Sequence, residues 1–140
     1  MELKLKNGRS LTVRSYIEDD FKYIQKLNEE EHWTNLAAKK QDTKDAWNNS
    51  NVTFVVLDQG EIAGYIRGLT DQSMTLFICE LLISKDYRRL GIGQELLQFV
   101  HRLYPKTRIE MLASSTSRTF YEQQKYRPFY GFRKTYEEHD

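Results

Sequence analysis

Alternating apolar and polar residues open the chain. Leu3 and Leu5, and then Leu11 and Val13, alternate with polar residues on either side of Asn7-Gly8. A period of two is typical of a strand, and Asn-Gly is a strong signal for a two-residue turn. The beginning of the chain therefore predicts a β-hairpin.

The apolar spacing becomes helical between Glu18 and about Glu30. Phe21, Ile24 and Leu27 share one face of this helix, and the acidic residues at its N-terminal end suit the helix dipole. The following segment, residues 29–51, is polar and hard to assign. Its alanines and its tryptophan suggest one or two short helices.

Three strands are expected next, over residues 51–57, 61–69 and 74–83, with a turn at Gln59-Gly60 between the first two. The third strand is almost continuously apolar, which is typical of a central strand buried on both faces. A helix with Ile92, Leu96 and Val100 on one side follows, and Pro105 ends it.

The last part of the chain completes a mixed α/β sheet. Residues 108–112 predict a strand that lies parallel to strand 74–83, because a right-handed crossover joins the two. Residues 114–124 predict a helix that begins with Ser/Thr caps. The aromatic tail, residues 126–137, predicts a final hairpin or pair of strands. The expected order is β-β-α-(α)-β-β-β-α-β-α-β-β.

Length and charge narrow the class of protein. At 140 residues the chain is expected to form one domain, residues 1–140. The net charge of +1, from 21 basic and 20 acidic residues, argues against a nucleic-acid-binding protein. Cys79 is the one cysteine, which excludes a disulfide framework and favours a cytoplasmic location. The sequence shows no signal peptide and no membrane-spanning stretch, so we expect no membrane partner.

The segment Arg88-Arg89-Leu90-Gly91-Ile92-Gly93 carries the clearest chemical signal. It joins an apolar strand to a helix, so the N–H groups of the first helical turn point at whatever binds there. The glycines allow close approach, and the two arginines add positive charge. We expect a phosphate-bearing ligand at this turn.

Two familiar phosphate motifs fit this turn poorly. A Walker loop needs Lys-Ser/Thr after its last glycine, where this chain has Gln94-Glu95. A Rossmann turn needs a third glycine where Leu96 stands, and it belongs to a run of parallel βαβ units that the upstream hairpins contradict.

The order of motifs resembles the GNAT superfamily of acetyl-CoA-dependent N-acetyltransferases. Glu80-Leu81-Leu82-Ile83 stands in place of the family's Glu-Leu-x-Val, and Arg88 to Gly93 follows at the family's spacing as Arg-x-x-Gly-x-Gly. Phe120-Tyr121-Glu122, followed by Gln124-Lys125-Tyr126, takes the place of the family's later Phe-Tyr-Glu and Leu-Gly-Phe. The resemblance implies a mostly antiparallel twisted sheet with one parallel, splayed strand pair and flanking helices.

The resemblance also implies how acetyl-CoA binds. The backbone from Arg89 to Gln94 would hold the pyrophosphate, and the backbone from Leu81 to Ile83 would pair with the pantetheine arm. An N–H near Leu82 would receive the acetyl carbonyl. The coenzyme-binding residues implied in this way are Leu81, Leu82, Ile83, Arg88, Arg89, Leu90, Gly91, Ile92, Gly93, Gln94 and Ser114. Ser114 replaces the family's usual Asn, and Lys125 replaces its usual Gly.

Glu80 and Tyr121 are the expected catalytic residues. Glu80 is the one charge between Met74 and Ile83, which suits a general base, although a salt-bridged Glu80 that only orders the sheet is the alternative. Tyr121 stands where the family places the acid that protonates the leaving thiolate, and a phenol pKa of about 10 matches that role. The competing interpretation is an ordinary packed tyrosine, and the tail tyrosines Tyr126, Tyr130 and Tyr136 are rival acids.

The remaining reactive residues favour structural roles. Cys79 reads as a buried thiol, and His32, His101 and His139 lack metal-ligand spacing, so no metal is expected. The run from Glu29 to Trp33 would attract a cationic amine, but a solvated helix end is the simpler interpretation.

The leading hypothesis is an N-acetyltransferase that transfers acetyl directly, in a ternary complex, to a small-molecule or peptide amine. The alternative is a catalytically weak acyl-CoA-binding sensor or regulatory module. The oligomeric state stays open, with a homodimer among the choices.

Overall fold

The computed structural model describes residues 1–139, apart from the side chain of Thr34. Its centre is one sheet of six strands in the order β1-β2-β3-β4-β5-β6. The strands are β1 (Glu2–Lys4), β2 (Ser10–Ser15), β3 (Val52–Asp58), β4 (Glu61–Thr70), β5 (Thr75–Ile83) and β6 (Arg108–Met111). Neighbouring strands are antiparallel except β5 and β6, which are parallel. The expected mixed sheet with one parallel pair is confirmed.

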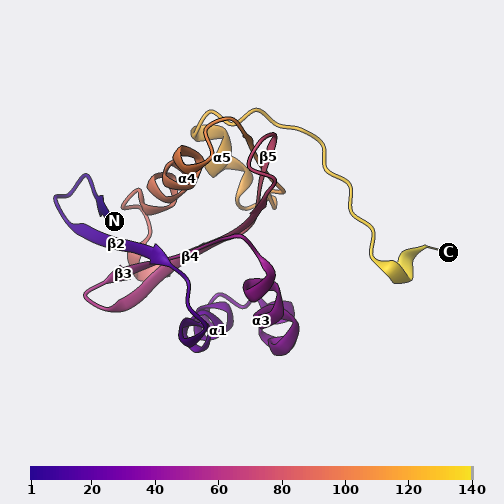
Figure 1. Ribbon diagram of the computed structural model, residues 1–140, viewed down its shortest axis with the longest axis horizontal. Helices are drawn as coiled ribbons and strands as arrows, with labels where there is room; N and C mark the ends of the chain where they lie inside the picture. Colours follow the sequence, from indigo (N-terminus) through magenta and orange to yellow (C-terminus); the bar gives the residue numbers. More distant parts are fainter. Residues whose placement is uncertain (140) are drawn as a thin grey trace.

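Helices cover both faces of the sheet (Figure 1). They are α1 (Phe21–Glu30), α2 (Thr34–Ala38), α3 (Lys40–Asn49), α4 (Ile92–Leu103) and α5 (Arg118–Gln123). Figure 1 shows α1 and α3 on one face and α4 and α5 on the other. The unassigned polar segment thus supplies two helices, α2 and α3.

Each face of the sheet has its own apolar core. The α4 side buries the hairpin leucines together with Leu76, Ile78 and the apolar face of α4. The α1/α3 side buries Leu82 and Tyr65 with residues of α1 and α3. The second core consists of Phe21, Ile24, Leu27, Trp47, Val55, Tyr65 and Leu82. The helical faces read from the sequence are therefore the buried ones.

A β-bulge in β5 moves its even-numbered residues from one core to the other. Arg67 lies opposite Glu80 but Gly68 lies opposite Ile78, so Cys79 is the extra residue on β5. Because alternation restarts at the bulge, Ile78 faces the α4 core whereas Glu80 points to the other face. The sequence pattern alone did not predict this reversal.

The end of the chain differs from expectation in two places. The helix expected over 114–124 begins at Arg118, because residues 114–117 form a capped turn first. The tail expected to form strands has none in its described residues, and holds one 3-10 turn, Tyr136–Glu138. The expectation of a final hairpin is wrong for the single chain, since the tail extends away from the sheet and finds no neighbouring strand there (Figure 1).

Candidate functional site: a splayed strand and a phosphate loop

Strand β5 separates from β6 halfway along its length. The two strands pair only from Thr75 to Ile78 of β5, and β5 continues to Ile83. On its other edge β5 stays paired with β4 along its whole C-terminal half. The backbone from Leu81 to Ile83 therefore has one edge turned toward the gap, which is the edge that an extended ligand would use.

The phosphate loop, residues 88–94, follows directly after this gap. A single 3-10 turn (Lys85–Tyr87) leads into it, and α4 begins at Ile92. Within residues 1–139, the backbone N–H groups from Arg89 to Gln94 donate to no other group of the chain, and the first donor of the helix is Glu95 N–H, to the Gly91 carbonyl. These free donors, at the positive end of a helix dipole, suit an anion.

Backbone conformation explains the first glycine of the loop. Gly91 has a φ of +84°, and Arg89 shares the left-handed region with a φ of +66°. A side chain at Gly91 would meet nothing within 4 Å, so the backbone angle, rather than space, demands glycine there. Gly93 differs, because a Cβ there would lie 3.3 Å from the Phe120 ring on α5.

Arg88 joins the loop to the first helix. Its Nη2 pairs with Glu31 at the end of α1, and its Nε donates to the Ile83 carbonyl at 3.1 Å. Arg88 therefore contacts both the splayed strand and α1. The acidic run at the end of α1 is only partly ion-paired: Glu31 pairs with Arg88, whereas Glu29 and Glu30 are exposed.

Glu80 is buried and ion-paired. Its Oε2 lies 2.6 Å from Arg67 Nε across the strand pair, and Arg67 also donates to Ser50 Oγ at 3.1 Å. Within the described residues, Glu80 Oε1 accepts no hydrogen bond. The structure thus shows a salt-bridged Glu80, and whether Glu80 acts as a base or only orders the sheet stays a prediction, since one carboxylate oxygen accepts no hydrogen bond from the described residues.

The sequence did not indicate three polar residues that lie near Glu80: the buried Tyr65 and Asn28, and the half-buried Arg67. Tyr65 donates to Asn28 Oδ1 at 2.5 Å in the core of the α1/α3 side, and Arg67 stands two residues further along β4. Burial, followed by the charge of Glu80, raises the pKa of Tyr65 well above its ordinary value. The alternation of side chains along β4 could have placed Tyr65 and Arg67 on one face. It could not identify Asn28 and Glu80 as their partners, because these residues lie far away in the sequence.

Tyr121 lies on α5, half-buried against the α4-side core. Its ring stands 5.1 Å from that of Phe120 and 5.6 Å from that of Tyr126, in edge-to-face contacts. Burial raises the pKa of Tyr121, and burial also raises that of Tyr126. A phenol that keeps its proton at neutral pH is what a proton donor needs. Tyr130 and Tyr136 are almost fully exposed in the tail.

The two departures from the family pattern are both accommodated. Ser114 is exposed and caps the turn before α5, with Ser117 N–H donating to its Oγ at 3.2 Å. Lys125 has a φ of +69°, the conformation that the usual glycine would take. Hydrogen bonds from Lys125 N–H to Glu122 and from Tyr126 N–H to Tyr121 complete a Schellman motif, so α5 ends as it would with glycine.

The cysteine and the histidines form no cluster with one another. Burial raises the pKa of the Cys79 thiol, which sits at the bulge. His101 contacts the Thr107 carbonyl at 2.8 Å, while His32 is exposed. Over the described residues, no group of three or more His, Cys, Asp or Glu side chains could hold a metal. Nor does this part of the chain contain a helix long and apolar enough to cross a membrane.

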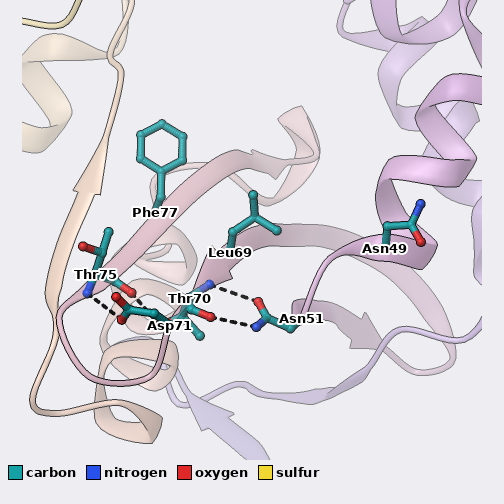
Figure 2. A pocket seen from close by; sticks show the side chains of 7 residues that line it. All are labelled: Asn49, Asn51, Leu69, Thr70, Asp71, Thr75 and Phe77. Atoms are coloured by element: carbon teal, nitrogen blue, oxygen red, sulfur yellow. Dashed lines mark hydrogen bonds between the residues drawn. The ribbon is translucent and has the colours of Figure 1, made fainter.

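A shallow hollow of about 360 Å³ lies at the other end of β5 (Figure 2). Its polar groups already satisfy one another: Asn51 exchanges two hydrogen bonds with the Thr70 backbone, and Asp71 accepts from the N–H of Thr75. The nine residues of β5 put this hollow roughly 25 Å from the phosphate loop. It is therefore separate from the candidate site.

Comparison with known families identifies the class. Residues 16–139 match the model of the acetyltransferase (GNAT) domain. The chain belongs to the GNAT acetyltransferase family. No curated protein matches the sequence.

Solved structures share the fold at low sequence identity. A GNAT-family acetyltransferase from Streptococcus pneumoniae has a TM-score of 0.67 and 18% identity, over 84% of this chain and 86% of that one. The PaiA N-acetyltransferase of Thermoplasma acidophilum, in complex with coenzyme A, has a TM-score of 0.66 and 15% identity, over 83% and 89%. An aminoglycoside acetyltransferase from an uncultured soil metagenomic sample, in complex with sisomicin, has a TM-score of 0.65 and 18% identity, over 89% and 95%.

Proposed function

We propose that this chain is a single N-acetyltransferase domain that transfers an acetyl group from acetyl-CoA to a primary amine in a ternary complex. The proposal rests on one observation: the splayed edge of β5 and the loop of unpaired N–H groups lie next to each other. The splayed edge of β5 ends directly before a loop whose N–H groups from Arg89 to Gln94 form no hydrogen bond with residues 1–139. The first feature suits an extended amide-bearing arm, and the second suits a pyrophosphate.

In the proposed reaction, the amine nitrogen attacks the thioester carbonyl carbon. A new C–N bond forms, the C–S bond breaks, and the negative charge of the carbonyl oxygen in between is stabilised by a backbone N–H near Leu82. The sulfur leaves as a thiolate and takes the proton of Tyr121. The amine loses its proton to Glu80, whose free Oε1 can hold the relaying water.

The alternative is an acyl-CoA-binding module with weak or no turnover. The ion pair between Glu80 and Arg67 favours this alternative, since it gives Glu80 a structural role between two strands that needs no turnover. The half-buried phenol of Tyr121 on α5, at the position where the family resemblance expects the proton donor, favours the enzyme.

Thiol release from acetyl-CoA separates the two functions. We expect release when the protein meets a panel of amines: polyamines, amino sugars, aminoglycosides and peptides with free amino groups. The complex of a structural relative with sisomicin makes aminoglycosides a rational first group. A raised melting temperature with acetyl-CoA, but no thiol from any amine, would instead support the binding module.

Tyr121→Phe and Gly91→Val then test the two halves of the site. Tyr121→Phe should lower kcat about 100-fold while coenzyme A still binds, because only the proton is removed. Gly91→Val should weaken coenzyme A binding, since valine resists a φ of +84°. Gly8→Val, which strains the distant hairpin in the same way at a φ of +88°, is the matched control and should leave binding unchanged.

A further inference from the structure

The phosphate loop has a backbone shape that the loop itself does little to hold. Arg89 and Gly91 take left-handed φ angles of +66° and +84°. The N–H groups from Arg89 to Gln94 form no hydrogen bond with residues 1–139. A left-handed φ is unfavourable for a residue with a side chain, and it persists where the surrounding structure imposes it. The contacts that fix this loop must therefore lie at its two ends.

The two ends are held in different ways. Where the loop leads into α4, Ile92 is buried in the α4-side core. Where the loop begins, the consecutive residues Tyr87 and Arg88 contact different parts of the chain. The side chains of the Arg88–Glu31 pair are 45% and 30% exposed, and an ion pair this open to solvent contributes little. Tyr87 is therefore the stronger candidate for the contact that fixes the start of the loop.

Tyr87 joins the start of the loop to two distant turns. Its ring packs against the α4-side core, and its hydroxyl donates to Asp58 Oδ2 at 2.8 Å. Asp58 is the last residue of β3, 29 positions earlier in the sequence. Arg9, just before β2, donates from Nη2 to the same oxygen at 2.5 Å, and its guanidinium carbon lies 5.8 Å from the centre of the Tyr87 ring. Three segments far apart in the sequence meet at one carboxylate.

The contact with Asp58 is well shielded. The Asp58 side chain is 15% exposed, although that of Arg9 is 48% exposed. A hydrogen bond to an ionised acceptor is stronger than one between neutral groups. The hydrogen bond to Asp58 also raises the pKa of Tyr87, so the phenol keeps the proton that it donates at neutral pH.

We propose that Asp58 is a positioning residue for coenzyme binding. It fixes Tyr87 and thereby the backbone shape that directs the N–H groups from Arg89 to Gln94 toward one anion. Donors that are already in place bind an anion more tightly than donors that must first be ordered. This inference rests on the coenzyme site of the proposed function, and it adds to that site a residue that touches no part of the coenzyme.

Removal of one hydroxyl tests the contact without changing a charge. Tyr87→Phe keeps the packed ring but loses the hydrogen bond to Asp58, so coenzyme A should bind the full chain about tenfold more weakly. Pantetheine lacks the pyrophosphate, so its affinity should change by less than about twofold. Tyr16→Phe, which removes a hydrogen bond to Asn48 Oδ1 on the α1/α3 side, is the matched control and should leave both affinities unchanged. Isothermal titration calorimetry measures both ligands.

Two substitutions of Asp58 separate the hydrogen bond from the charge. Asp58→Asn and Asp58→Leu both remove the carboxylate charge, but only asparagine keeps an oxygen that can accept from the Tyr87 hydroxyl. Asp58→Leu should therefore bind coenzyme A about tenfold more weakly than Asp58→Asn does. In a Tyr87→Phe background the two variants should bind it equally, because no hydroxyl remains to donate.

The outcomes distinguish this inference from the proposed function. If Tyr87→Phe binds coenzyme A as tightly as the wild type, the inference is wrong. Equal losses for coenzyme A and pantetheine would also overturn it, because they would indicate a general loss of structure. A wild-type protein that binds coenzyme A but acetylates no amine would contradict the enzyme and leave the role of Asp58 standing. A wild-type protein that binds no coenzyme A would refute both.

Discussion

Glu80 and Arg88 are both ion-paired, and each pair joins an element of the candidate site to a neighbouring element. Glu80 pairs across strands with Arg67, and Arg88 reaches from the phosphate loop to Glu31, the residue that follows α1. The sequence suggested Glu80 because it is a single charge in an apolar run. It could not suggest Arg67, because a bulge sets the register that places the two side chains together.

Replacing each member of the Glu80–Arg67 pair distinguishes a base from a structural carboxylate. Glu80→Gln should lower kcat about 100-fold or more, because the amine then has no proton acceptor. Arg67→Gln breaks the same ion pair but keeps the carboxylate, so its loss of kcat should be much smaller. Steady-state kinetics with acetyl-CoA and the best amine provide the measurement. Equal losses in the two variants would show that Glu80 only orders the sheet.

Asp71 provides a test by pH. The N–H groups of Thr75, Met74 and Ser73 lower the pKa of Asp71 from 3.8 to about 2. A lowered folded-state pKa contributes stability above the ordinary pKa, and that contribution is lost as the pH falls from about 4 to 2. Urea unfolding midpoints across this range should therefore fall more steeply for the wild type than for Asp71→Asn. Asn keeps a hydrogen-bond acceptor but no titration, so parallel curves for the two proteins would contradict this account.

At the scale of elements, periodicity predicted most of the fold and failed where an element depends on a distant partner. The strands, α1 and α4 follow from local apolar spacing, and they lie close to the expected bounds. The tail has the pattern of a strand, yet its described residues form none, because a strand also needs an edge to pair with. The turn at residues 114–117 delays α5 because side chains of Ser114 and Ser117 bond locally before the helix begins.

The backbone at the end of α5 is strained, and a single substitution should relieve the strain. Lys125 takes a left-handed φ of +69° that costs a residue with a Cβ about 1 kcal/mol. Lys125→Gly should therefore raise the free energy of unfolding by about that amount. Chemical denaturation measures it, with Gln124→Gly as the control, because Gln124 has a φ of −86° and gains nothing from glycine. If the two glycine variants have the same stability, the left-handed angle is not the cause.

At the scale of the whole molecule, β5 contributes to both cores, as β3 and β4 do, and it also borders the candidate site. Strand β5 contributes Leu76 and Ile78 to one core and Leu82 to the other. A ligand that binds along its splayed half therefore contacts an element that unfolds only with the whole fold. Its binding free energy should appear as global stability.

Coenzyme A at 100 times its Kd should raise the free energy of unfolding by about 2.7 kcal/mol. Pantetheine at the same concentration should raise it much less, because it lacks the pyrophosphate that the N–H groups from Arg89 to Gln94 would bind. Thermal and urea unfolding with each ligand provide the comparison. Equal stabilisation by the two ligands would show that the phosphate loop does not bind the pyrophosphate.

The bulge at Cys79 fixes which face of the sheet each side chain of β5 points to. Up to Ile78 the even-numbered residues face α4, and from Glu80 onward they face α1 and α3. Replacing a side chain in this strand changes one contact. Deleting one residue before Glu80 would reverse the alternation of the side chains that follow. Glu80 would then point away from Arg67, and the later residues of the strand would face the opposite core. Variation within β5 should therefore consist of substitutions, whereas insertions and deletions of single residues should be confined to its ends.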